Sequence, residues 1–273
     1  MQRFLLKSAV LFLLPVIFFS CKKNNNGSDA TVVKEWSLNM SAKNENPAPA
    51  GRSEAGMATI KLMSDNSIMY NFNVTGLASG DALTGAHFHS GNAGANGGVI
   101  LSFNPTFSGT SSSGTILNVR QSLVDSLKND ANEIYFNVHS NQVASGLVRA
   151  QINTKVELAM DIMLSGSNEV PAVSTSATGT ARLRLTADKK LYSVINVTNL
   201  EAGDALLFAH VHSGAAGVNG PIVLGIAGSA SDFATEKVYA LTDVIYNSIK
   251  NDAMYVNAHS TLHANGVVRG QIR

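Results

Sequence analysis

The stretch IMYNFNVT, from Ile68 to Thr75, has an apolar side chain at every second position, and the positions between them are polar except for Met69. Successive side chains of a β-strand point to opposite faces, so the apolar half of this stretch would share one buried face. The polar segment SDNS (64–67) precedes it and suits a hairpin turn, as ADKK (187–190) does before a similar stretch at 191–198. The pattern predicts short antiparallel strands whose inward-facing residues are Ile68, Tyr70, Phe72 and Val74 in the first stretch and Leu191, Ile195 and Val197 in the second.

The chain repeats itself at an offset of about 123 residues. NENPAPA (44–50) aligns with NEVPAV (168–173), GAHFHSG (85–91) with FAHVHSG (208–214), and YFNVHSNQVASGLVRAQI (135–152) with YVNAHSTLHANGVVRGQI (255–272). Solenoid repeats are only about 20 to 50 residues long, so this period indicates one domain per repeat. We predict a first domain over 33–153 and a second over 156–273, joined by a very short linker around Thr154.

A single short helix is predicted in each domain, because apolar residues recur every four positions: Val119, Leu123 and Leu127 in the first, and Leu241, Ile245 and Ile249 in the second. Thr242 is placed to cap the second helix. Elsewhere, short strands separated by Gly, Asn and Ser turns favour a sandwich of two antiparallel sheets, with a barrel as the alternative. We therefore expect an all-β protein of two tandem antiparallel β-sandwich domains, each with one short helix.

The N-terminus has the features of an export signal. Arg3 and Lys7 precede an apolar run over 9–19 that is too short to span a bilayer comfortably, and Ser20-Cys21 then resembles a bacterial lipobox. We predict a lipoprotein signal peptide over 1–20, lipidation of Cys21 and a polar tether over 21–32. The protein would be exported and held to a membrane by its lipid, facing either the periplasm or the cell surface. The alternative for Cys21 is a buried free thiol; as the only cysteine it forms no intramolecular disulfide.

Charge argues against a nucleic-acid partner. Removal of residues 1–20 would leave 18 basic and 19 acidic residues, a formal charge of −1. The chain therefore lacks the excess of positive charge that binds nucleic-acid phosphates. The composition, 45% hydrophobic and 14% charged, also excludes a disordered chain.

Four blocks occur in the same order in both repeats: Asn-Glu-x-Pro, His-x-His-Ser-Gly, Tyr-x-Asn-x-His and Gly-x-Val-Arg-x-Gln-Ile. Together they resemble the CHRD domain, a family named after the animal developmental protein chordin and found in many microbial exported proteins. The resemblance covers nearly all of the chain beyond the predicted signal peptide and tether. Minor departures are Asn46, where the second copy has Val170, and Ala150, where it has Gly270. The resemblance implies an immunoglobulin-like β fold and no settled biochemical activity.

Six of the seven histidines fall at three equivalent positions of the repeat. His87 and His89 share one face of their strand, and His139 shares the face of Tyr135 and Asn137 on another. If these strands are neighbours, three neutral imidazoles would converge in each domain, an arrangement suited to copper or zinc with an open fourth position. The candidate metal ligands are His87, His89 and His139 in the first domain and His210, His212 and His259 in the second.

Copper/zinc superoxide dismutases are similar in part, since they also present a His-x-His strand and a later strand histidine on a sandwich. The chain shows no bridging histidine followed by a zinc-binding aspartate and has no disulfide, so superoxide chemistry is not favoured. The structural alternative is that the histidines hydrogen-bond the backbone of the glycine-rich loops SGNAGANG (90–97) and SGAAGVNG (213–220) without metal.

Each domain also carries an arginine on its closing strand. Arg149 and Arg269 could clamp a carboxylate ligand or, as we expect, pair with Glu45 and Glu169 of the Asn-Glu motif. No catalytic arrangement is indicated. We therefore expect a binding or structural module of the cell envelope. The alternatives are a metalloprotein with one three-histidine site per domain, and an adhesion or matrix protein that binds a protein or glycan partner bivalently.

Overall fold

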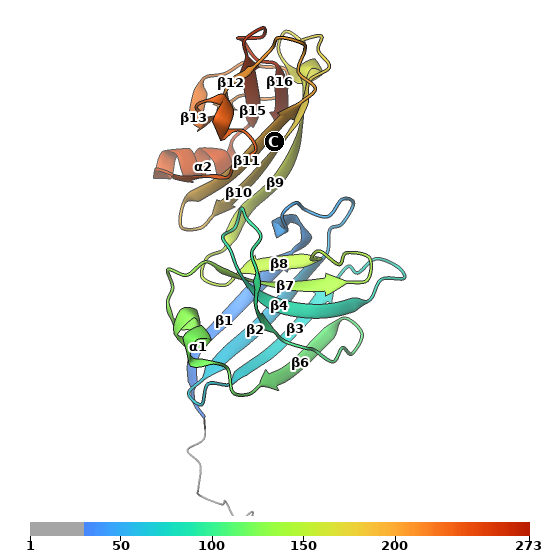
Figure 1. Cartoon of the computed structure of the whole chain (residues 1–273), viewed down its shortest axis with the longest axis vertical. Coiled ribbons are helices and arrows are strands. Elements are labelled where there is room, and N and C mark those ends of the chain that lie inside the picture. The colour runs from blue at the N-terminus through green and yellow to red at the C-terminus, as the bar shows by residue number, and fades with distance from the viewer. Residues whose placement is uncertain (1–29) are drawn as a thin grey trace, which may run out of the picture. The chain divides into compact units, whose positions relative to one another are not determined.

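The computed structural model describes residues 30–273, which contain two β domains (Figure 1). Each domain has its own hydrophobic core, one built from residues 36–152 and the other from residues 162–272. The predicted signal peptide, Cys21 and all of the tether before residue 30 lie outside the described residues. Among residues 30–273, no helix has the length and apolar character needed to cross a membrane.

The prediction of an all-β protein is confirmed, and each domain contains eight strands. The first domain comprises β1 (Val32–Ser41), β2 (Ala55–Met63), β3 (Ile68–Thr75), β4 (Leu83–Ser90), β5 (Val99–Ser102), β6 (Ser111–Ile116), β7 (Ile134–Ser140) and β8 (Val148–Gln151). The second comprises β9 (Val156–Ser165), β10 (Thr178–Thr186), β11 (Lys190–Thr198), β12 (Leu206–Ser213), β13 (Ile222–Ala227), β14 (Lys237–Ala240), β15 (Met254–Ser260) and β16 (Val268–Gln271).

Hydrogen bonds join the eight strands of the first domain in the order β5-β4-β7-β8-β1-β2-β3-β6, and the second domain repeats this order. The link between β8 and β1 is narrow, since only Ser41 and Arg149 pair there. The sheet folds over at this point into two layers. Rings from opposite layers meet in the core: Phe72 of β3 lies 5.5 Å from Phe136 of β7, centroid to centroid. The result is a β-sandwich whose layers stay continuous at one corner.

The apolar side chains whose alternation predicted the strands also form the cores. All seven residues predicted to face inward on β3 and β11 are buried. On β4, Ala86 and Phe88 are fully buried, so their neighbours His87 and His89 lie on the opposite face. The apolar side chains of β7 point into the same core and turn His139 the other way.

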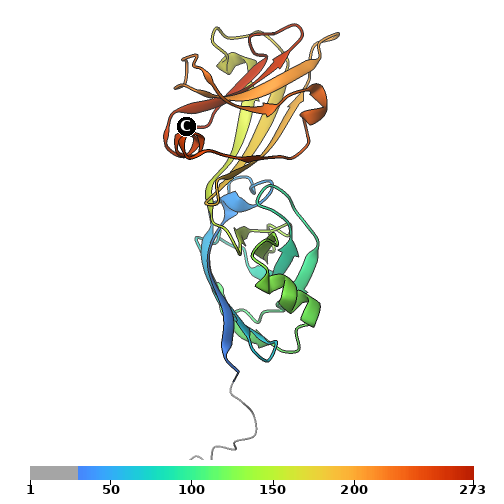
Figure 2. The ribbon, with the colours of Figure 1, turned by 90° about the vertical axis from the view of Figure 1, so that its left-hand side faces the viewer.

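The two predicted α-helices are present as α1 (Gln121–Lys128) and α2 (Asp243–Asn251). Thr242 caps α2, accepting a hydrogen bond from the Ile245 amide at 3.4 Å. Figures 1 and 2 show each helix on the outside of the strands of its own domain. Three short 3-10 turns, η1 (Ala42–Asn44), η2 (Gly166–Asn168) and η3 (Ala230–Asp232), complete the helical elements of the described chain.

The start of β4 is fixed by Asp81, as the equivalent Asp204 fixes β12. The Asp81 carboxylate accepts hydrogen bonds from the backbone amides of Ala82 and Gln142, at 2.9 and 3.0 Å, and from the Ser140 hydroxyl at 2.8 Å. This side chain therefore ties the turn before β4 to the end of β7. These two strands carry the histidines of the first domain.

Candidate metal centre

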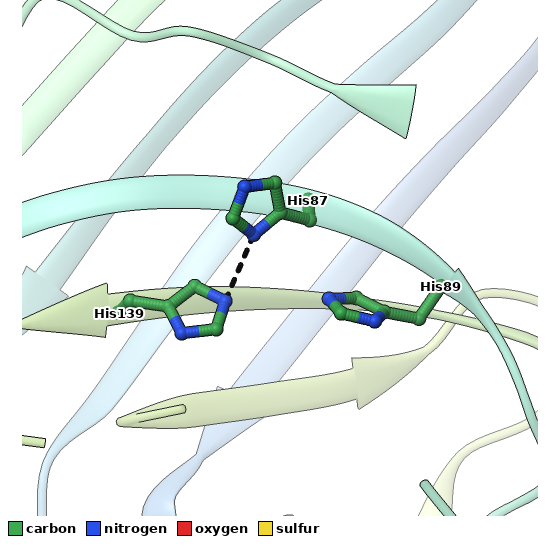
Figure 3. A group of neighbouring side chains, drawn as sticks. All are labelled: His87, His89 and His139. Carbon is green, nitrogen blue, oxygen red and sulfur yellow. Dashed lines mark hydrogen bonds between the residues drawn. The ribbon is translucent and has the colours of Figure 1, made fainter. Parts of the chain in front are cut away.

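The three histidines of the first domain lie on neighbouring strands. Antiparallel pairing of β4 with β7 sets His87 opposite Asn137, His89 opposite Tyr135, and Gly85 opposite His139. Opposite residues of antiparallel strands present their side chains on the same face of the sheet. The three imidazoles consequently converge outside the sandwich core, as Figure 3 shows.

The ring nitrogens are close enough to act on one small ligand. One nitrogen from each ring lies within 4.8 Å of the other two. His87 Nδ1 and His139 Nε2 are 2.9 Å apart, and His139 Nε2 is 3.1 Å from Asn137 Oδ1. His89 Nε2 is buried and has no hydrogen-bond partner. The sequence-predicted histidines thus form one cluster that contains an unpartnered buried acceptor.

Backbone carbonyls fix the tautomers of two rings. His89 Nδ1 donates to the Gly97 carbonyl and His139 Nδ1 to the Ala144 carbonyl, each at 2.9 Å, because a carbonyl can only accept. The lone pairs of both rings are therefore on Nε2, the nitrogen that faces the cluster. Such hydrogen bonds to the outer nitrogen are typical of histidines that bind metals.

Burial keeps the cluster uncharged. Burial and, to a smaller extent, the neighbouring imidazoles of His139 and His89 together lower the pKa of His87 to about 4. Burial also lowers the pKa of His89 and of His139, against the opposing effect of their backbone hydrogen bonds. At neutral pH all three rings are neutral, which is the form that binds a metal ion.

The glycine-rich loop positions His89. A Cβ on Gly97 would lie 1.5 Å from the Ser90 carbonyl oxygen, so only glycine allows this close approach of the backbone. The Gly97 amide donates to the Tyr135 hydroxyl at 3.3 Å, and the Tyr135 ring stacks on His89 with an interplanar angle of 4°. The loop therefore orients His89, and its backbone hydrogen-bonds that histidine as the structural alternative from the sequence expected.

Arg149 holds this loop in place. Its guanidinium donates to the carbonyls of Asn92 and Ala95 and to the Asn96 side chain, and stacks 3.4 Å from the centroid of the Tyr135 ring. Among the described residues, no ion pair joins Arg149 to Glu45, contrary to our expectation from the sequence. The buried guanidinium instead finds three acceptors in the loop, which satisfy its donors without a carboxylate.

Glu45 reaches the cluster through Asn137. The Glu45 carboxyl and the Asn137 amide both lie against Gly146, and the Asn137 oxygen lies 3.1 Å from His139 Nε2. Burial raises the pKa of Glu45 to about 7, although the charge of Arg149 and the Asn137 amide lower it. Gly146 makes room for this contact, because a Cβ there would lie 2.7 Å from Glu45 Oε1. The Asn-Glu motif thus supports the face that carries the histidines.

The second domain reproduces these contacts on β12 and β15. His210 Nδ1 is 3.3 Å from His259 Nε2, and His212 Nδ1 is 2.9 Å from the Gly220 carbonyl. His212 Nε2 is again buried without a partner. Arg269 donates to loop carbonyls and stacks on its tyrosine, while Glu169 again forms no ion pair with it among the described residues.

Sequence reasoning overlooked the groups that orient the rings. Tyr135 and Tyr255 stack on histidines, Asn137 and Asn257 contact them, and the carbonyls of Ala144 and Ala264 accept from them. The tyrosines and asparagines were placed on the correct face, and their recurrence in both repeats was the available signal. The alanines offered none, since a backbone carbonyl leaves no trace in a sequence.

The family model of the CHRD domain matches residues 36–152 and again residues 160–272. No curated protein and no solved structure gives a significant match. Because the two matches cover most of the chain, the protein belongs to the CHRD domain family, and the resemblance seen in its sequence motifs is confirmed. Tandem CHRD domains support a structural or binding module.

Proposed function

We propose that this protein is a metal-binding protein of the cell envelope in which each CHRD domain holds one copper or zinc ion through three histidines. The observation that carries the proposal is the buried, unpartnered Nε2 of His89, which is turned toward His139 (Figure 3). The same atom of His212 is unpartnered in the second domain. A group that binds these atoms would explain why both copies keep them.

Hydrogen bonding alone does not account for the cluster. The structural alternative explains the Nδ1 atoms of His89 and His139, which donate to backbone carbonyls. It leaves the Nε2 acceptor of His89 buried with no donor, at a cost of about 1–3 kcal/mol. A bound cation removes this cost and uses the lone pair that the Gly97 carbonyl has fixed on Nε2.

The spacing of the nitrogens fits a single ion. Two nitrogens about 2.0–2.1 Å from one tetrahedral ion lie about 3.3 Å apart. The His210 and His259 nitrogens are already 3.3 Å apart, and the His87 and His139 nitrogens are 2.9 Å apart. The longest separation in each cluster is at most 4.8 Å, so a shared ion requires these nitrogens to approach each other by up to about 1.5 Å. Three neutral nitrogen ligands are the set that copper and zinc accept, and Cu(II) binds such sites most tightly among divalent first-row ions.

A lipid anchor would hold the two centres at a membrane surface. This part of the proposal is supported by the sequence alone, in which the apolar run ends in Ser20-Cys21. The Cys21→Ser variant is expected to appear in the soluble fraction with its signal peptide unprocessed. A membrane-bound and normally processed variant would rule out the anchor and would leave the metal centres unaffected.

The metal sites are tested by elemental analysis and titration of the metal-free protein with copper or zinc. We expect about two ions per chain, one for each histidine cluster, and one ion after His87→Ala. His263→Ala is the matched control, because His263 is the one histidine outside both clusters and should leave the stoichiometry unchanged. A parent protein that takes up neither ion would refute the proposal.

A further inference from the structure

The two clusters differ at one position that the pairing of the strands places beside the histidines. Gly85 of β4 lies directly opposite His139, and at the equivalent place of the second domain Phe208 of β12 lies opposite His259. Each of these residues precedes a His-x-His pair and lies on the same face of its strand as those histidines. Domain 1 therefore has no side chain where domain 2 has a large ring.

The Phe208 ring covers the second cluster. Its centroid lies 5.0 Å from that of His210 and 4.7 Å from that of His259. His259 is buried, with 7% of its surface exposed, whereas His139 is only half-buried. The ring thus lies against both histidines; His210 nevertheless stays half-buried, as its counterpart His87 does in the first domain.

The first cluster instead opens into a hollow of about 330 Å³. His87 and His139 form part of its wall, and Thr84, Asn104, Pro105 and Ala144 line the rest. A small molecule in this hollow would reach both rings directly. Gly85 forms part of the lining, and a side chain at this position would extend beside the His87 ring, since a Cβ there would lie 3.5 Å from His87 Cε1.

We propose that the domain 1 centre takes a small exogenous anion as a fourth ligand in this hollow, while Phe208 excludes such a ligand from the domain 2 centre. The inference rests on the proposed metal sites. It assigns the two copies different tasks: an accessible centre in domain 1 that can exchange ligands, and a shielded centre in domain 2 that only holds its ion.

The chemistry of the hollow favours an anion. Three neutral imidazoles leave the full charge of a divalent ion uncompensated, so a negative fourth ligand is attracted to it. No carboxylate lines the hollow to repel that ligand, and Thr84 and Asn104 bring hydrogen-bonding side chains to its wall. A tetrahedral site with three protein ligands keeps one position for such a group.

The test uses the full chain with one cluster disabled at a time, loaded with Cu(II) and titrated with azide. His212→Ala with His259→Ala leaves the domain 1 centre, and His89→Ala with His139→Ala leaves the domain 2 centre. The azide-to-copper charge-transfer absorption reports anion binding. We expect saturable binding at the domain 1 centre, and binding weaker by about tenfold or more at the domain 2 centre, where a ring blocks the approach.

Reciprocal substitutions identify the cause of the difference. Gly85→Phe in the domain 1 form should suppress azide binding, and Phe208→Gly in the domain 2 form should create it. Gly85→Ala is the matched control: its Cβ would meet His87 Cε1 at 3.5 Å, an ordinary contact, and should leave azide binding nearly unchanged. If Gly85→Phe does not retain copper, the gain in Phe208→Gly decides the question alone.

The outcomes separate the two proposals. Failure of both single-cluster forms to bind Cu(II) would refute the metal sites themselves. Copper binding with equal azide affinity in the two forms, or with no gain in Phe208→Gly, would leave the metal sites standing and overturn the difference in access.

Discussion

Replacement of Glu45 by glutamine should remove a pH-dependent loss of stability from domain 1. Glu45 is 4% exposed, and its Oε1 atom has no hydrogen-bond partner. Burial raises its pKa to about 7, which the nearby Arg149 charge only partly opposes. The folded domain therefore prefers the protonated carboxyl, and the unfolded chain releases that proton near pH 4.5.

The sign and size of the effect follow from this difference. Between about pH 4.5 and 7 the folded state binds more protons than the unfolded state, so the free energy of unfolding falls as pH rises. A pKa raised from 4.5 to about 7 corresponds to a total loss of about 3 kcal/mol. The lowered pKa of His87 acts in the opposite direction, stabilising the fold as pH rises from about 4 to 6.5. That contribution is common to the parent and the Glu45→Gln variant, and it cancels in their difference.

The assay is urea unfolding followed by tryptophan fluorescence. Trp36 is the only tryptophan of the chain and lies in the core of domain 1, so its signal reports this domain alone. Between pH 4.5 and 7.5, the Glu45→Gln variant should gain about 3 kcal/mol relative to the parent. Glu35→Gln, which removes an exposed carboxylate of the same domain, is the matched control. A parent-to-variant difference that stays constant across this range would show that buried Glu45 is already ionised, and would refute the reasoning.

Three further predictions concern the same domain. Gly97→Ala places a Cβ 1.5 Å from the Ser90 carbonyl oxygen, so the loop must open. The unfolding transition followed by Trp36 fluorescence should shift to lower urea concentration, and the chain should bind one metal ion instead of two. Arg149→Lys keeps the charge but loses the planar fork that binds several loop acceptors, and should lower the free energy of unfolding by about 1–3 kcal/mol for each acceptor left unpaired in that assay. Zinc at about 100 times its dissociation constant should stabilise domain 1 by about 2.7 kcal/mol, and His87→Ala should abolish this gain; equal stabilisation of parent and variant would contradict the assigned ligand.

The strands and their inner faces were predictable because a period of two is a local property of the sequence. Ile68 and Phe72 on β3, and Ile134 and Phe136 on β7, are buried as the alternation requires. The helices were predictable for the same reason, although α1 begins at Gln121, two residues after the buried Val119. The six histidines could be grouped from the repeat, and the pairing of β4 with β7 and of β12 with β15 then brought each set of three together.

The partner of Arg149 could not be predicted, because it depends on how a loop packs. A sequence shows that an arginine and a glutamate recur together, and a direct ion pair is then the simplest expectation. In the fold, Arg149 is surrounded by the carbonyls of Asn92 and Ala95, and these acceptors would be left without donors if the guanidinium turned to Glu45. Several hydrogen bonds to one planar fork outweigh a single pair of buried charges, whose desolvation is costly.

The internal duplication gives the chain a matched comparison within itself. Gly97 and Gly220 approach a preceding carbonyl in the same way, and both His89 and His212 are stacked on a tyrosine and bonded to that glycine. The scaffold that orients the rings is therefore the same in both domains. The two domains therefore orient their histidines in the same way but differ beside them, where domain 1 has Gly85 and domain 2 has Phe208. We expect this difference to alter how a ligand reaches the nitrogens, and not how the nitrogens are arranged. Exchanging these two residues consequently changes access while keeping all six histidines, which makes it a sharper test of the centres than removing any of their ligands.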